Sequence, residues 1–205
     1  MTNPDLRHIA IVLDRSGSMQ SVKSDTEGGL KAFLIAQSDA PGETTVSLYH
    51  FDDKYSAVYE NKHLDDIPDY TLDPRGGTAL LDAVGRTISA VGVQLAAKAE
   101  GDRPAEVIVV ILTDGEENSS REFSLSAVKK MITEQQDAYG WKFVFLGADQ
   151  DAFEAAGGMG IGRGTTLSYA SANTTNSMTK AGHMVARGTA SGLYAFTDAE
   201  RDDAS

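Results

Sequence analysis

An oxygen-rich loop, Asp14-Arg15-Ser16-Gly17-Ser18, directly follows the apolar run at residues 9–13. Its carboxylate and two hydroxyls stand on alternate residues, so we expect them to point the same way. Hard cations such as Mg²⁺ prefer oxygen ligands of this kind, held in an octahedron. Two more segments carry similar groups, Arg75-Gly76-Gly77-Thr78 and Leu112-Thr113-Asp114-Gly115. The chemistry of the chain therefore depends on whether these three loops converge.

The elements between these loops alternate in type. Short apolar runs predict strands, and apolar residues at helical spacing predict helices between them. This pattern favours an α/β fold, with a doubly wound and mostly parallel central sheet, one antiparallel edge strand, and helices on both faces. The expected strands are 8–13, 45–51, 57–60 at the edge, 107–112 and 142–146, and the expected helices are 22–37, 78–97 and 125–139.

Asp14 and Asp114 each follow the carboxyl end of an expected strand. Open sheets of this class bind ligands at that edge, near the point where the strand order reverses. We therefore place both carboxylates in one site.

In the helix expected at 125–139, Leu125 and Tyr139 belong to the predicted buried stripe.

The C-terminal third carries weaker signals. We expect a short helical piece and a glycine cluster within 149–164, a short strand at 165–169 and a final helix around 178–189. The glycine cluster opens no long helix, so a dinucleotide site is not expected. The chain is predicted to be one domain, 1–205, with a core at about 6–190 and an acidic tail at 191–205 whose last residues are frayed.

Composition narrows the function. The 205 residues are 41 % apolar and carry a formal net charge of −12, which argues against binding to nucleic acid or to an anionic membrane surface. Cysteine is absent, and the four histidines lack the spacing of a zinc site. No apolar run approaches the roughly 20 residues that span a bilayer, and no signal peptide is recognisable. We expect a soluble cytoplasmic protein.

Together, the three loops resemble those of a von Willebrand factor type A (VWA) domain with a metal-ion-dependent adhesion site. The matching residues are Asp14, Ser16, Ser18, Thr78 and Asp114, and the likeness covers residues 6–190. It is greater to stand-alone bacterial and phage domains than to integrin domains. The resemblance implies a Rossmann-like VWA fold. It also implies direct ligation of Mg²⁺ (alternatively Mn²⁺ or Ca²⁺) by Ser16, Ser18 and Thr78, with Asp14 and Asp114 acting through water.

By the same resemblance, the protein is a non-enzymatic binding module whose cation captures an Asp or Glu of a partner protein. Partners in an AAA-type ATPase system, or other host or phage proteins, are implied contexts. In the family, the contact of the threonine corresponding to Thr78 can change as the final helix shifts.

Two other hypotheses fit the same residues. Asp14 can be the nucleophile of a Mg²⁺-dependent phosphohydrolase, although Ser16 stands where such enzymes carry a second acid. The domain can also be structural, with a metal site that never fills. Among the neighbouring side chains, Arg15 and Asp52 are expected to be solvated. The segment 116–118 is expected to cap the next helix or to line the rim of the site.

Overall fold

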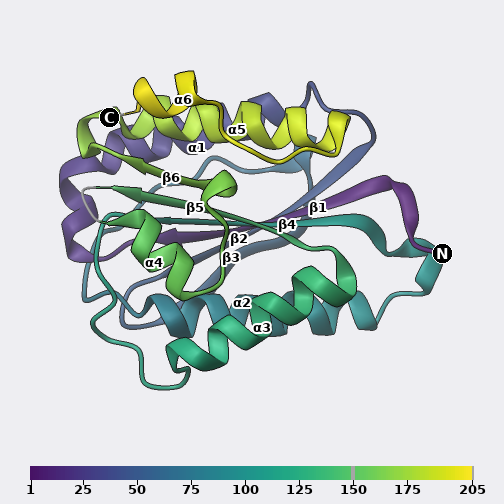
Figure 1. Ribbon diagram of the computed structural model, residues 1–205, viewed down its shortest axis with the longest axis horizontal. Helices are drawn as coiled ribbons and strands as arrows, with labels where there is room; N and C mark the ends of the chain where they lie inside the picture. The colour runs from purple at the N-terminus through teal and green to yellow at the C-terminus, as the bar shows by residue number, and fades with distance from the viewer. Residues whose placement is uncertain (149–150, 205) are drawn as a thin grey trace.

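The computed structural model describes residues 1–148 and 151–204, which fold around a six-stranded sheet (Figure 1). The strand order is β3-β2-β1-β4-β5-β6; β3 is antiparallel to β2, and the other neighbouring strands are parallel. The predicted sheet, with its antiparallel edge strand, is confirmed. The strands are β1 (Asn3–Asp14), β2 (Glu43–Phe51), β3 (Tyr55–His63), β4 (Pro104–Thr113), β5 (Lys142–Ala148) and β6 (Thr166–Tyr169).

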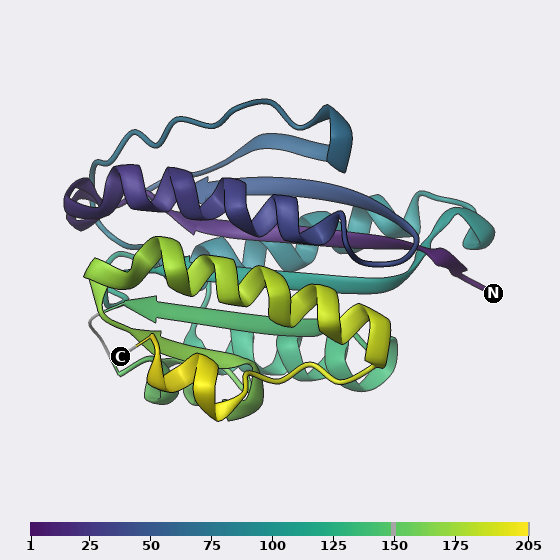
Figure 2. The same ribbon diagram turned by 90° about the horizontal axis from the view of Figure 1, so that it is seen from above.

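Helices cover both faces of the sheet (Figure 1). One face carries α1 (Lys23–Gln37), α5 (Thr174–Ser191) and α6 (Asp198–Asp202), and the view from above shows α1 and α5 side by side (Figure 2). The opposite face carries α2 (Leu80–Ala96), α3 (Leu125–Tyr139) and α4 (Ala152–Gly158). The layers are therefore those of a doubly wound α/β domain.

The central strand β1 shows why the sequence reads as continuous apolar runs. Ile9, Ile11 and Leu13 pack on the face that α1 and α5 cover. Ala10 and Val12 pack on the opposite face, against the α2, α3 and α4 layer. Both faces of the strand are buried, so neither set of alternate positions can be polar.

In α3 the predicted buried stripe is correct only at its centre. Val128 and Ile132 are fully buried, whereas Leu125 is 46 % exposed and Tyr139 is 65 % exposed. Leu125 lies at the first turn of α3 and leans toward Gly158 of α4 instead of entering the core.

The prediction of a frayed C-terminus is wrong for the described residues. α6 begins with a capping box in which Thr197 and Glu200 satisfy each other's backbone N–H groups. Arg201 then donates hydrogen bonds to the carbonyl oxygen of Thr166 at 2.6 Å and to those of residues 163 and 164. Phe196 and Ala204 are buried, so this segment is part of the packed domain.

Within the ranges that the structure describes, no helix combines the length and the apolarity that crossing a bilayer requires.

Candidate metal centre

Asp14 ends β1 and joins the first loop to the neighbouring strand. Its Oδ1 accepts a hydrogen bond from the Ser16 backbone N–H at 2.7 Å, and its Oδ2 accepts one from the Thr113 hydroxyl at 2.5 Å. Burial raises the pKa of Asp14 to about 6, although these hydrogen bonds favour the charged form. This fully buried carboxylate is poorly solvated, so a nearby cation would stabilise its charge.

The two loop serines lie together above Asp14. Ser16 Oγ and Ser18 Oγ are 3.0 Å apart, and the Ser18 hydroxyl donates to Oδ1 of Asp114 at 2.6 Å. A 3₁₀ turn beginning at Gly17 folds the chain back immediately, which brings both hydroxyls to the same side. The first and third loops therefore meet directly.

Thr78, from the second loop, meets the same point beside Gly115. A Cβ added to Gly115 would lie 2.9 Å from Thr78 Oγ1 and 3.6 Å from Ser18 Oγ. Both hydroxyls therefore lie next to Gly115, where the absence of a side chain lets them approach. Any larger residue there would press on the Thr78 hydroxyl.

All five side chains predicted for the site are thus brought together at the carboxyl ends of β1 and β4, where the strand order reverses. They offer two carboxylates and three hydroxyls. In the part of the chain that the structure describes, no three His, Cys, Asp or Glu side chains form a group that could hold a metal ion. A cation here would therefore depend on hydroxyl oxygens, which suit Mg²⁺ and not a soft metal.

Backbone hydrogen bonds hold the first and second loops in place. Gly17 N–H donates to the Gly76 carbonyl at 3.1 Å, and Arg75 N–H donates to the Arg15 carbonyl at 2.8 Å. Gly76 has a φ of +70°, a left-handed conformation that favours glycine. The glycines of the second loop thus serve its turn as well as its close approach to the first loop.

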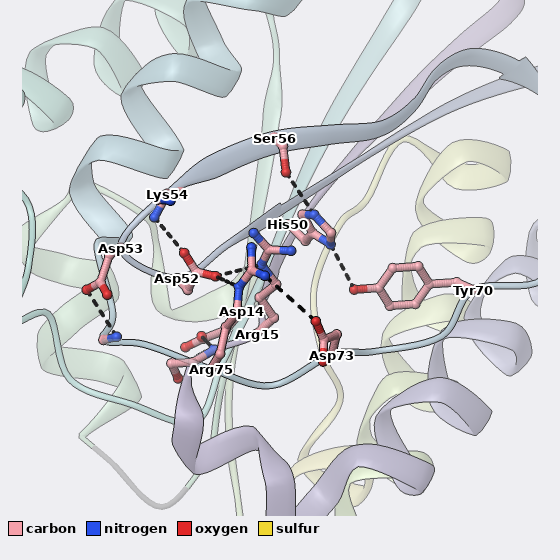
Figure 3. A network of polar contacts seen from close by, with 12 residues as sticks. Asp14, Arg15, His50, Asp52, Asp53, Lys54, Ser56, Tyr70, Asp73 and Arg75 are labelled. Carbon is pink, nitrogen blue, oxygen red and sulfur yellow. Dashed lines mark hydrogen bonds and ion pairs between the residues drawn. The ribbon is translucent and has the colours of Figure 1, made fainter.

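An ion cluster centred on the buried Asp52 joins these loops (Figure 3). Asp52, 3 % exposed, places its Oδ2 2.9 Å from Arg15 Nε and 2.8 Å from Arg75 Nε, and its Oδ1 accepts the Lys54 N–H at 2.6 Å. The Arg15 N–H is not well aimed at the oxygen, so that contact is an ion pair without a good hydrogen bond. The Asp52 carbonyl accepts the N–H of Ala79, next to Thr78.

The expectation that Arg15 and Asp52 are solvated is therefore wrong, because each neutralises the other in the interior. Arg15 is only 6 % exposed. The Arg15 guanidinium lies against Asp52 of the β2–β3 turn (Figure 3).

The segment after Asp114 caps α2, the preceding helix, and not α3 as one prediction had it. Asn118 Oδ1 accepts the Thr78 N–H at 3.0 Å, and Glu117 Oε2 accepts the Leu81 N–H at 2.9 Å. These N–H groups lie at or just before the start of the helix, where no carbonyl of the helix itself is available to them. The third loop thereby fixes the backbone of Thr78.

Asp82 ties the same two segments from the helix side. Its Oδ1 accepts the N–H groups of Glu122 and Phe123 at 2.9 and 2.8 Å, and its Oδ2 accepts that of Arg121 at 2.9 Å. Burial opposes the charge of Asp82, but these three hydrogen bonds outweigh it and lower the pKa of the carboxyl.

Sequence reasoning missed three supporting residues, Thr113, Asp52 and Asp82. Thr113 alone carried a usable signal, since it directly precedes Asp114 in the loop already singled out. Asp52 and Asp82 act on segments 37 and about 40 positions away, so no local pattern marks them.

Comparisons with known proteins find similar folds among solved structures. No family model matches the sequence, and no curated protein matches it. Among solved structures, proximal thread matrix protein 1 from the mussel byssus is similar with a TM-score of 0.61 and 15 % identity, over 90 % of this chain and 47 % of that one. A von Willebrand factor type A protein from Catenulispora acidiphila is similar with a TM-score of 0.59 and 14 % identity, over 87 % of this chain and 42 % of that one.

A third similar structure is the vWF domain of a type V pili tip protein from Porphyromonas gingivalis, with a TM-score of 0.57 and 10 % identity, over 93 % of this chain and 97 % of that one. The chain spans less than half of the mussel and Catenulispora chains. At such low sequence identity, the similarity establishes only a shared fold. The chain has the fold of a von Willebrand factor type A domain.

Proposed function

We propose that this protein is a binding module that holds Mg²⁺ at Asp14, Ser16, Ser18, Thr78 and Asp114 and uses it to capture an acidic side chain of a partner protein. The observation that carries the proposal is the convergence of these five side chains from three loops. In the residues described, hydrogen bonds connect Asp14, Ser16, Ser18 and Asp114 in turn at the switch point of the sheet, and Thr78 lies close by, next to Gly115.

The chemistry of the oxygens supports Mg²⁺ as the ion, because hydroxyl and carboxylate oxygens are ligands of hard cations. Ser16 Oγ and Ser18 Oγ lie 3.0 Å apart, close enough to contact one ion together. Mn²⁺ is the natural alternative, because it also favours octahedral oxygen sites.

The charges explain why capture would depend on the ion. The chain has a formal net charge of −12, and two carboxylates border the candidate site. An approaching Asp or Glu is therefore repelled when no cation is bound. Asp14 and Asp114 would act on the ion through water, and its direct protein ligands would be neutral hydroxyls, so a carboxylate from outside would be a favourable further ligand.

The first alternative is a phosphohydrolase with Asp14 as nucleophile. Both Asp14 oxygens already accept short hydrogen bonds, and the side chain is fully buried. A nucleophile needs a free oxygen that faces the substrate, so the geometry favours a non-enzymatic role. Mg²⁺-dependent turnover of a generic phosphate ester that is lost on Asp14→Asn would overturn this conclusion.

The second alternative is a structural domain whose site stays empty. Titration calorimetry and thermal melting with Mg²⁺ and Mn²⁺ separate the two, because a bound ion raises the melting temperature as its concentration exceeds Kd. We expect binding heat and stabilisation for the wild type, their loss in Ser16→Ala, and no change in Ser38→Ala at the far end of α1. Wild-type protein that shows neither heat nor stabilisation would refute the proposal.

The partner can then be sought by affinity capture from the native host, with and without EDTA. Proteins lost both with EDTA and with Asp14→Ala are candidates, and members of an AAA-type ATPase system are among those we expect. Capture that is indifferent to EDTA would speak against a bridging cation.

A further inference from the structure

A groove of about 600 Å³ lies directly beside the candidate metal centre. It is bounded by the first turns of α2 and α3 and by α4 (Figure 1). Glu116, on its rim, is two residues from Asp114, a span of at most about 7 Å. A peptide of a few residues that reaches the metal centre therefore also reaches this groove.

The floor of the groove is apolar. Leu80, Leu81, Ala155 and Met159 contribute to it. Leu125 stands over it with 46 % of its surface exposed, although its position in the helix pattern is that of a core residue. A side chain that fills the groove would remove this leucine from water, which is favourable in proportion to the apolar surface buried.

The rim of the groove is acidic. Glu116, Asp151 and Glu154 line it and are exposed. Glu117 also lines it, but its oxygens accept hydrogen bonds from the backbone N–H groups of Leu81, Ser119 and Ser120. No lysine or arginine is among the described residues that border the groove. Its potential is therefore negative, with no internal compensation.

We infer that the groove receives a hydrophobic side chain flanked by Lys or Arg, from the same partner segment whose acidic residue reaches the cation. The inference rests on the proposed function and adds the sequence character of the partner. The acid is drawn by the ion, the hydrophobic residue by the apolar floor, and the basic residue by the carboxylates of the rim. A second copy of this acidic chain is disfavoured as the occupant, because like charges would meet.

The test is selection of peptides from a random phage-displayed library on the whole protein in Mg²⁺, with elution at low pH, followed by binding measurements in Mg²⁺ and in EDTA. We expect the selected peptides to share an Asp or Glu with a hydrophobic residue and a Lys or Arg within about four positions. Synthetic versions of these peptides should bind the Glu154→Lys variant about tenfold more weakly than they bind the wild type. This difference should become smaller at high salt, which screens the interaction between the charges. Leu125→Ala should also weaken binding, by severalfold.

Glu134→Lys is the matched control, since this exposed glutamate lies farther along α3 and does not border the groove. Equal melting temperatures of the variants in EDTA exclude misfolding. Selected peptides with an acid but no hydrophobic or basic preference, or equal binding to Glu154→Lys and Glu134→Lys, would overturn the groove and leave cation capture intact. Peptides that depend on Glu154 but bind equally with EDTA would overturn cation capture, and failure to select any peptide would overturn both.

Discussion

Replacing Asp52 by asparagine should destabilise the protein far more than its position in a hairpin turn suggests. Asparagine keeps the size of the side chain and can still accept the Lys54 N–H, so the change removes mainly the charge. Arg15, 6 % exposed, then remains as a buried cation without its ion-pair partner. Breaking a buried pair on one side costs about 3–5 kcal/mol. Against a typical total stability of about 5–15 kcal/mol, this is a large loss.

Arg75 provides the matched comparison on the same carboxylate. Its side chain is 53 % exposed, so Arg75→Ala removes a solvated partner of Asp52 and should cost only about 0–1 kcal/mol. Burial alone would raise the pKa of Asp52, but hydrogen bonds from Arg75 and from the Lys54 N–H outweigh it and lower the pKa. The stabilisation is therefore complete above the ordinary carboxyl pKa and is lost only as the pH falls through the lowered value.

The assay is urea unfolding at pH 7.5 in EDTA, followed by circular dichroism. We expect the free energy of unfolding to fall by about 3 kcal/mol or more in Asp52→Asn, with the slope against urea unchanged. The double variant Arg15→Met/Asp52→Leu should recover much of the loss, because neither charge is then buried. If Asp52→Asn costs no more than Arg75→Ala, the reasoning from burial is refuted.

Three further predictions follow from the geometry. Gly115→Ala should lower the Mg²⁺ affinity by about tenfold or more in calorimetry, with little change of melting temperature in EDTA, because the new Cβ would lie 2.9 Å from Thr78 Oγ1; unchanged affinity would contradict the placement of Thr78. Burial lowers the pKa of His8 to about 4 from 6.5, so its neutral form stabilises the fold fully above pH 6.5, and this is lost toward pH 4. Between pH 6.5 and pH 4, the free energy of unfolding of His8→Gln in urea should fall less steeply with decreasing pH than that of the wild type, by up to about 1.4 kcal/mol per pH unit. Parallel curves for the two proteins would refute this. Gly182→Ala should cost about 1–3 kcal/mol in the same assay, since its Cβ would lie 2.9 Å from Phe33 Cα, and a neutral result would show that α1 and α5 can separate freely.

Much of the fold could be predicted because its signals are local. β4 is apolar at each position from Val107 to Leu112, as a strand buried on both faces must be, and Ser124, directly before α3, is a typical cap residue that accepts the Ala127 N–H. The meeting of Asp14 and Asp114 followed from topology, since the carboxyl ends of adjacent parallel strands share one edge.

The misses arose where partners are distant in sequence. Arg15 and Asp52 each look like solvated loop residues, and only the pairing of β1 with β2 puts them together. The apolar spacing of α3 shows which face of the helix Leu125 lies on, but not whether neighbouring elements reach far enough along the helix to cover it. A residue on the correct face is therefore buried in one turn and borders a groove in another.

The C-terminal segment has a consequence for the behaviour of the protein at high concentration. β6 is an outer strand, and outer strands present backbone groups on which a second chain can add. Here Arg201 occupies the Thr166 carbonyl, and the Ala204 carbonyl takes the Ala170 N–H at 3.2 Å. The segment thus covers backbone groups at the outer edge of a sheet whose strands are strongly apolar. Loss of this segment would leave the edge open to pairing with a second chain and hence to aggregation by sheet extension.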